Sequence, residues 1–166
     1  ELLGRLTIKE MQTIKGIGSA KAIILQAAME LGRRRQAEKV VLQAISSSKV
    51  AAEMLYPIIM DKPHEAFTIM YLNNANKVIQ IEIVSEGGIT ATVVDIKVIL
   101  KKALLHLASK IILAHNHPSG NLTPSAADKN ITQKIKAAAQ TLEIDVLDHL
   151  IIGRNEYYSF ADEGDL

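Results

Sequence analysis

An unbroken apolar run, Ile111-Ile112-Leu113-Ala114, is the feature that most limits the folds open to this chain. A short continuous apolar run is typical of a strand that is covered on both faces, and such strands occur in sheets with helices on each side. The run leads directly into His115-Asn116-His117-Pro118, so polar side chains follow at the end of the strand. The sequence therefore predicts a helix-flanked sheet with a polar site at the end of a buried strand.

The two histidines have the spacing of side chains that share one face of a strand. Side chains two residues apart point to the same face, so His115 and His117 can converge on one point while Asn116 faces away. Zero cysteines exclude a thiolate metal site and disulfides. Imidazole nitrogens are therefore the first candidates for metal ligands in this chain.

A carboxylate can complete the same site if the chain turns back after the histidines. The stretch 118–121 is rich in turn residues, and Thr123-Pro124 predicts a helix N-cap followed by proline at the first helical position. Asp128 is then expected in the second turn of a helix that starts beside the strand end. Two His and one carboxylate leave an open coordination position, as in a catalytic zinc site.

Two other interpretations of these residues remain open from the residue types alone. Two His and one carboxylate also describe the triad of a mononuclear iron oxygenase, so ligand types do not select zinc. The histidines could also only cap a strand end and bond to loop carbonyls. Metal analysis separates these alternatives.

The pattern His115-x-His117-x7-Ser125-x2-Asp128 resembles the JAMM (MPN+) metalloprotease motif, and the stretches 113–120 and 148–153 resemble the bacterial RadC family within it. The resemblance extends over nearly the whole chain. It implies an α/β (α+β) fold with a mixed sheet flanked by helices, similar to JAMM and cytidine deaminase domains. It also implies that His115, His117 and Asp128 bind one zinc ion per chain.

The resemblance implies two further catalytic residues. The serine that supports the oxyanion in the family falls on Ser125. The family's general base is a distant upstream glutamate, which we place at Glu65 in the stretch 63–67. The rival is Glu86, whose alternative interpretation is a solvated turn residue.

These residues imply a zinc-dependent hydrolase, specifically a metallopeptidase or isopeptidase that acts through a metal-bound water. The metal would lower the pKa of its water, and Glu65 would take the proton and pass it to the leaving amine. Two alternatives from other classes are a DNA-binding or scaffold protein of DNA repair or recombination with an idle metal site, and a metal-dependent nuclease.

A second motif lies near the N-terminus, between helical patterns at 7–13 and 19–35. The stretch 14–22 resembles a helix-hairpin-helix, whose Gly-x-Gly turn brings backbone N–H groups close to a phosphate. The DNA contacts that this implies are Lys15, Gly16, Gly18 and Lys21. An ordinary helical hairpin is the alternative, with Arg33-Arg34-Arg35 as a solvated helix end.

The charge distribution agrees with an anionic partner for the hairpin. Residues 1–39 have eight Lys and Arg against four Asp and Glu, a net charge of +4, whereas residues 40–166 have eleven against fourteen, a net charge of −3. We therefore expect two parts, a helix-hairpin-helix segment at 1–39 and a JAMM-like metal-binding hydrolase domain at 40–166. Their boundary is expected near 36–44.

Apolar periodicity and turn residues predict the remaining elements. We expect a helix at 47–60 capped by the serines at 46–48, strands at 65–73 and 77–85 joined by a turn at 73–76, and strands at 145–152 and 156–161. Asp95 is expected to cap a further helix. The inward stripes of the two helices beside the sheet are expected to be Ile96, Ile99, Leu100, Ala103 and Leu107, and Ile131, Ile135, Ala138 and Leu142.

The composition is that of a globular protein, with 48% hydrophobic and 22% charged residues. No signal peptide or long apolar span appears, so a cytoplasmic protein is expected. Because the chain starts at Glu1 and not at methionine, we expect sequence to precede it, including part of the hairpin segment.

Overall fold

The computed structural model describes residues 7–40, 44–60, 62–87, 94–154 and 156–166. The chain divides into two compact units, Glu1–Leu42 and Gln43–Leu166, which are described separately. Among the described residues, no helix combines the length and the apolar composition that crossing a membrane requires.

The first unit is a pair of helices. Helix α1 (Ile8–Met11) begins at Thr7, whose side chain forms a capping box with Glu10. Helix α2 (Ser19–Val40) continues past the predicted end at residue 35. The side chains of Arg33-Arg34-Arg35 lie outside the described residues, so the expectation of a solvated helix end stays a prediction.

The second unit is built on a five-stranded sheet with the order β2-β1-β3-β4-β5. Its elements are α3 (Ser48–Ile59), β1 (Ala66–Leu72), β2 (Val78–Glu86), α4 (Ile96–Leu105), β3 (Lys110–Asn116), α5 (Ala126–Gln140), β4 (Asp145–Ile152) and β5 (Tyr157–Ser159). Strands β3 and β4 are parallel, whereas β1–β2, β1–β3 and β4–β5 are antiparallel. The predicted mixed sheet is confirmed.

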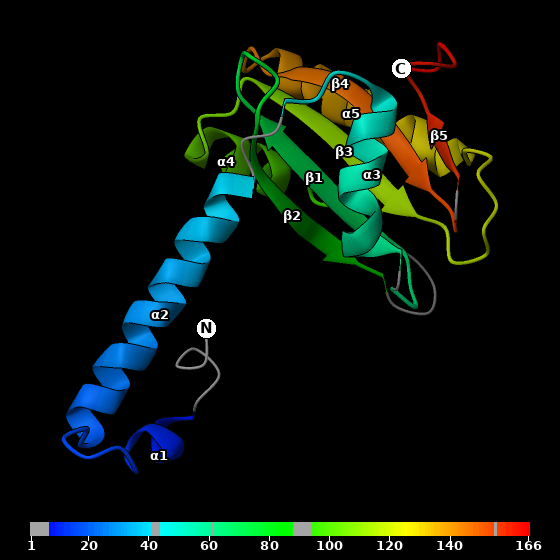
Figure 1. The fold of residues 1–166 in the computed structure, drawn as a ribbon. Helices are drawn as coiled ribbons and strands as arrows, with labels where there is room; N and C mark the ends of the chain where they lie inside the picture. The colour runs from blue at the N-terminus through cyan, green and yellow to red at the C-terminus, as the bar shows by residue number, and fades with distance from the viewer. Residues whose placement is uncertain (1–6, 41–43, 61, 88–93, 155) are drawn as a thin grey trace. The chain divides into compact units, whose positions relative to one another are not determined.

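Helices cover both faces of this sheet, with α3 on one face and α4 and α5 on the other (Figure 1). Along β3, Ile111 and Leu113 belong to the core under α4 and α5, whereas the side chains that alternate with them point to the face of α3. All of β3 from Ile111 to Asn116 is buried. This alternation places His115 on the α5 face and Asn116 on the opposite face.

The predicted caps of α3 and α4 and the predicted turn at 73–76 are confirmed. Ser47 caps α3 and accepts a hydrogen bond from the backbone N–H of Val50, and Asp95 caps α4 in the same way through the N–H of Lys97. Asn73 closes the turn between β1 and β2, where its side chain accepts hydrogen bonds from two backbone N–H groups.

Both inward stripes were predicted only in part. Ile99 and Ala103 of α4 are buried, but Leu107 is 87% exposed, because α4 ends at Leu105 and Leu107 has a left-handed backbone with φ 53°. On α5 the buried residues are Thr132, Ile135 and Ala139. The prediction that Ala138 and Leu142 belong to the buried face of this helix was therefore wrong. The helix is rotated so that a threonine faces the sheet, and apolar periodicity alone does not predict a polar residue there.

Candidate metal centre

Strand β3 fixes His115 at the centre of the sheet. Its backbone lies between Phe67 of β1 and Ile151 of β4, and its side chain is buried with 3% of its surface exposed. The ring of Phe67 stacks on the imidazole with 6.0 Å between centroids. His117 follows the strand end, where its backbone N–H donates to the carbonyl of Ile152 at 3.2 Å. The strand pairing therefore continues far enough to hold both histidines.

Asp128 comes from the first turn of α5, not from the second. The predicted N-cap at Thr123-Pro124 was wrong: Ser125 is the N-cap, and α5 begins at Ala126. Ser125 Oγ accepts from the N–H of Asp128 at 3.1 Å, and Asp128 Oδ2 accepts from the N–H of Ser125 at 2.7 Å. This capping box gives the Ser-x-x-Asp spacing a structural reason, because it fixes the carboxylate at the start of the helix.

The three predicted ligands converge. Among the described residues, His115, His117 and Asp128 form a group whose ligand atoms all lie within 4.8 Å of one another. The two Nε2 atoms are 3.0 Å apart, and Asp128 Oδ1 lies 3.3 Å from His115 Nε2. Asp128 Oδ2 lies 3.8 Å from His117 Nε2. Two imidazole nitrogens and a carboxylate are a donor set that fits Zn²⁺ or Fe²⁺.

The hydrogen bond of His117 directs its other nitrogen to the centre of this group. His117 Nδ1 lies 2.5 Å from the carbonyl oxygen of Asn121. A carbonyl only accepts, so Nδ1 donates the proton and the neutral ring has its lone pair on Nε2. That lone pair is the one a metal ligand uses.

Electrostatics also favour a neutral His115. The pKa of His115 is lowered to about 4, mainly by burial; the carboxylate of Asp128 acts to raise it, and the imidazole of His117 acts to lower it. At neutral pH the ring is therefore uncharged, as metal ligation requires.

A cleft of about 500 Å³ opens beside the three residues. It is lined by Glu65, Phe67, Val94, His115, His117, Ser119, Asn121, Thr123, Ser125, Ala127, Asp128 and Ile131. Both predicted catalytic residues, Glu65 and Ser125, therefore face the same cleft as the histidines. Ser125 uses an oxygen lone pair for the cap, so its hydroxyl hydrogen can still donate.

The two candidate bases have different surroundings. Glu65 lies immediately before β1 and lines the cleft. Glu86 ends β2 and forms an exposed ion pair with Lys62 at 2.6 Å, and it is not among the described residues that line the cleft. The position of Glu65 supports its choice over Glu86, although a catalytic role for Glu65 stays a prediction.

Asn116 joins strand β3, which contains His115, to the loop that contains Glu65. Its Oδ1 accepts from the N–H of Ala66 at 2.7 Å, and its Nδ2 donates to the carbonyls of His64 and Lys62 at 3.2 and 3.4 Å. These bonds lie on the face opposite to the metal ligands. One strand therefore positions the two histidines with one face and the Glu65 loop with the other.

Sequence reasoning left His149 out of the site. This fully buried residue of β4 lies beside Leu113 of β3, and its Nε2 is 2.8 Å from Nδ1 of His115. The signal for it was a histidine in a strand next to the ligand strand. The parallel register of β3 and β4, which a single sequence does not specify, was needed to bring the two rings together.

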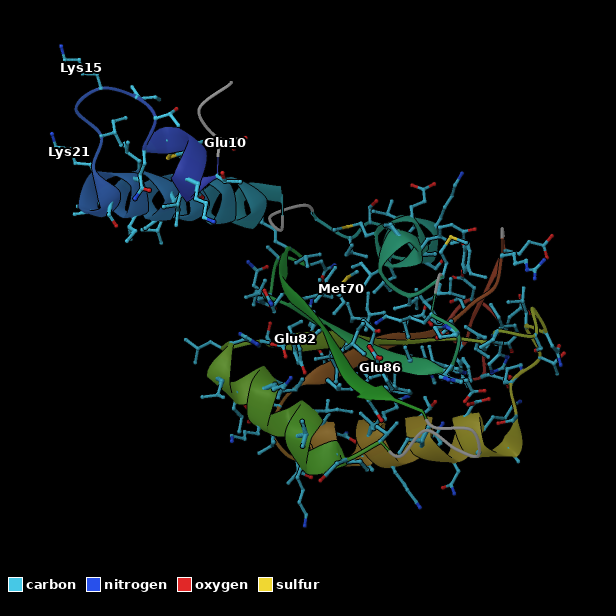
Figure 2. The ribbon with its side chains drawn as sticks, turned by 90° about the horizontal axis from the view of Figure 1, so that it is seen from below. Glu10, Lys15, Lys21, Met70, Glu82 and Glu86 are labelled. Carbon is cyan, nitrogen blue, oxygen red and sulfur yellow. The ribbon has the colours of Figure 1, made fainter. Side chains whose placement is uncertain are left out.

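The predicted DNA contacts lie in the first unit: Lys15, Gly16 and Gly18 in the loop between α1 and α2, and Lys21 in the first turn of α2. Gly16 has φ +90°, a conformation that favours glycine, and its carbonyl accepts from Nζ of Lys21 at 3.1 Å. Gly18 directly precedes α2. Lys15 extends outward from the loop, and Lys21 from the start of α2 (Figure 2). A helical hairpin is present, and its binding of DNA stays a prediction.

Comparison with known proteins agrees with this fold. A UPF0758 protein of Flavobacterium johnsoniae is 50% identical over 163 residues, which are 98% of this chain and 71% of that protein. UPF0758 proteins of Porphyromonas gingivalis and Chlorobium chlorochromatii are 42% and 38% identical, over 98% and 99% of this chain and 73% and 74% of their own lengths. Residues 45–165 match the RadC-like JAB domain, and this range of the chain contains every candidate metal ligand. The chain therefore belongs to the family of the RadC-like JAB domain.

Proposed function

We propose that this protein is a zinc-dependent hydrolase that cleaves peptide or isopeptide bonds. The observation that carries the proposal is the convergence of His115, His117 and Asp128 at a cleft that also contains Glu65. The three ligands would hold the ion and leave a coordination position open, as catalytic zinc sites do. A structural zinc site would use four protein ligands.

Each residue of the site would have a distinct task. When bound, zinc supplies Lewis acidity, which polarises a carbonyl and lowers the pKa of water. Glu65 would accept a proton from the attacking water and return it to the leaving amine, a transfer worth about 10² to 10⁴ in rate. The hydroxyl of Ser125 would donate to the oxyanion, and one such donor is worth about 10² to 10³.

The lining of the cleft supports a peptide over a nucleic acid as substrate. The described residues that line it include the carboxylates of Glu65 and Asp128 and no Lys or Arg. Phosphoryl groups are usually bound by Lys, Arg or additional metal ions, and the described lining offers no Lys or Arg for this purpose. The membership of the JAB family also favours peptide bonds, because the JAMM motif that this chain resembles is that of metalloproteases.

The first test is the metal content of protein purified without chelator or added zinc. We expect one zinc ion per chain in the natural protein and none in the double variant His115→Ala/His117→Ala. Iron in place of zinc would point to oxygenase chemistry. Absence of metal, or metal that the variant retains, would overturn the proposed site.

The second test separates Glu65 from metal binding. Glu65→Gln should keep the metal, because Glu65 is not among the ligands, and should lose hydrolysis of a peptide library by about 10² to 10⁴. Glu86→Gln is the matched control and should retain activity. Unchanged hydrolysis in Glu65→Gln would remove Glu65 from the mechanism, and cleavage of DNA with no cleavage of peptides would favour a nuclease.

A further inference from the structure

We infer that His149 and Thr132 are positioning residues that determine which nitrogen of His115 has the proton, and so make Nε2 the metal ligand. The inference rests on the proposed metal site. It concerns a buried chain of hydrogen bonds that runs from the helix of Asp128, through β4, to the ligand strand β3.

Three contacts make up this chain. Thr132 Oγ1 lies 2.6 Å from the carbonyl oxygen of Asp128 and 2.5 Å from Nδ1 of His149. His149 Nε2 lies 2.8 Å from Nδ1 of His115. Thr132 and His149 are fully buried and His115 is 3% exposed, so water does not replace these bonds easily. Leaving a buried polar group without a partner is unfavourable, so one arrangement that satisfies all of these groups is favoured.

The direction of each bond follows from the one group that can only accept. The carbonyl of Asp128 has no proton, so the single hydroxyl hydrogen of Thr132 points to it. The oxygen of Thr132 must then accept from His149, which places a proton on His149 Nδ1. A neutral His149 with its proton on Nδ1 has a lone pair on Nε2, and that lone pair accepts from Nδ1 of His115.

His149 is held in the neutral state that this chain requires. The ring is fully buried, and its two nitrogens face Thr132 and His115, neither of which is a carboxylate that could stabilise a charged imidazolium. Its ring is also held in place, since it stacks on Phe160 with 4.7 Å between centroids and contacts Phe67 at 5.5 Å. Neither ring flipping nor a second proton is therefore favourable.

The consequence appears at the metal centre. With its proton on Nδ1, His115 presents only a lone pair on Nε2, and His117 does the same because its Nδ1 donates to Asn121. Two lone pairs 3.0 Å apart repel each other unless a cation lies between them and the carboxylate of Asp128. If the chain ran in the opposite direction, a proton on His115 Nε2 would occupy the position of the metal.

The hydroxyl of Thr132 is the group to remove. Thr132→Val has nearly the same shape but no acceptor for His149, so the proton of His149 is no longer directed to Nδ1. Thr132→Ser restores the hydroxyl. Thr141→Val is the control, because Thr141 Oγ1 also donates to the carbonyl four residues before it, Ala137, but is exposed. Thr132→Ala replaces the valine variant if valine prevents folding.

Two measurements test the inference. In the metal-free protein, long-range ¹H–¹⁵N NMR correlations should place the protons of His115 and His149 on Nδ1. Titration with Zn²⁺ against a chelator should show affinity about 10- to 100-fold weaker in Thr132→Val, the range found when partners of metal-binding histidines are removed. Thr132→Ser and Thr141→Val should bind within a few-fold of the natural protein.

The outcomes separate this inference from the proposed function. A natural protein that binds no Zn²⁺ would overturn the metal site and the role of the chain with it. Binding by the natural protein with a proton on Nε2 of His115 before metal is added would overturn the inference alone. So would equal affinity in Thr132→Val, or a loss in Thr132→Ser as large as in Thr132→Val, since the hydroxyl would then not be responsible.

Discussion

Asn116 separates the two candidate metal-binding histidines in the sequence and links them to the candidate base in space. Replacing it with alanine removes the bonds to the backbone of the Glu65 loop, at Ala66, His64 and Lys62. We expect Asn116→Ala to keep its metal, to lose about 1–3 kcal/mol of stability and to lower kcat at least tenfold, because Glu65 is no longer held beside the ligands. Metal analysis, urea unfolding and hydrolysis rates measure these effects.

The control for Asn116 is another asparagine that clamps backbone groups away from the cleft. Asn73→Ala breaks two bonds to backbone N–H groups in the turn between β1 and β2. The Asn73→Ala variant should have a lower free energy of unfolding, and its kcat should be unchanged at temperatures where the protein is folded. Equal losses of kcat in both variants would mean that Asn116 acts only through stability.

The sequence was enough to predict that the candidate metal ligands converge but not which residues contact and orient them. The alternation of a strand brings His115 and His117 together, and this depends only on local geometry. The contact between His115 and His149 depends on the register of two strands, and Thr132 depends on how α5 is rotated against the sheet. Such relations between distant elements leave no periodic signal in one chain.

At the scale of elements, Glu82 attaches α4 to the sheet. This residue of β2, which is labelled in Figure 2, contacts Nζ of Lys102 and lies 2.6 Å from Nε2 of His106, the C-cap of α4. Burial raises its pKa, but the bonds to Lys102 and His106 outweigh burial, so the net pKa lies below the ordinary value of 4.5. The charged carboxylate is therefore more stable in the folded protein than in the unfolded chain.

Glu82→Gln should cost about 1 kcal/mol of stability at pH 7, and this cost should disappear on acidification. Because the folded-state pKa is lowered, the contribution of Glu82 is fully present above about pH 4.5 and is lost as the pH falls through the folded-state value. Urea unfolding at pH 7 and at a series of pH values below 4.5 measures both. Glu86→Gln, which breaks the more exposed pair with Lys62, should cost less than half as much. A cost for Glu82→Gln that does not decline anywhere in that acidic series would contradict the electrostatic explanation.

Helix starts were predicted better than helix ends. Ser47 and Asp95 are short polar residues before apolar periods, which is a local signal for an N-cap. The end of α4 has no glycine, since the left-handed residue after its C-cap His106 is Leu107. Thr123-Pro124 resembles the N-terminus of a helix, but α5 is capped by Ser125 instead. The capping box of Ser125 with Asp128 satisfies two backbone N–H groups.

At the scale of the whole molecule, positive charge is concentrated at one end of the sequence. Residues 1–39 have a net charge of +4 and residues 40–166 a net charge of −3. The candidate metal cleft belongs to the acidic part, and its described lining has no Lys or Arg. A nucleic acid partner is therefore expected at the hairpin, and a different substrate at the cleft.

If the hairpin binds DNA through backbone phosphates, its affinity for duplex DNA should fall steeply with salt and should not depend on sequence. Lys15→Gln/Lys21→Gln removes the two charges beside the Gly16 turn and should reduce the slope of log K against log salt by about 2. Lys97→Gln/Lys101→Gln on α4 removes the same charge elsewhere and should leave the slope unchanged. Fluorescence anisotropy between 50 and 200 mM salt measures both slopes. Absent or salt-insensitive binding would make the hairpin a docking element for protein, since phosphate contact without counterion release is not expected.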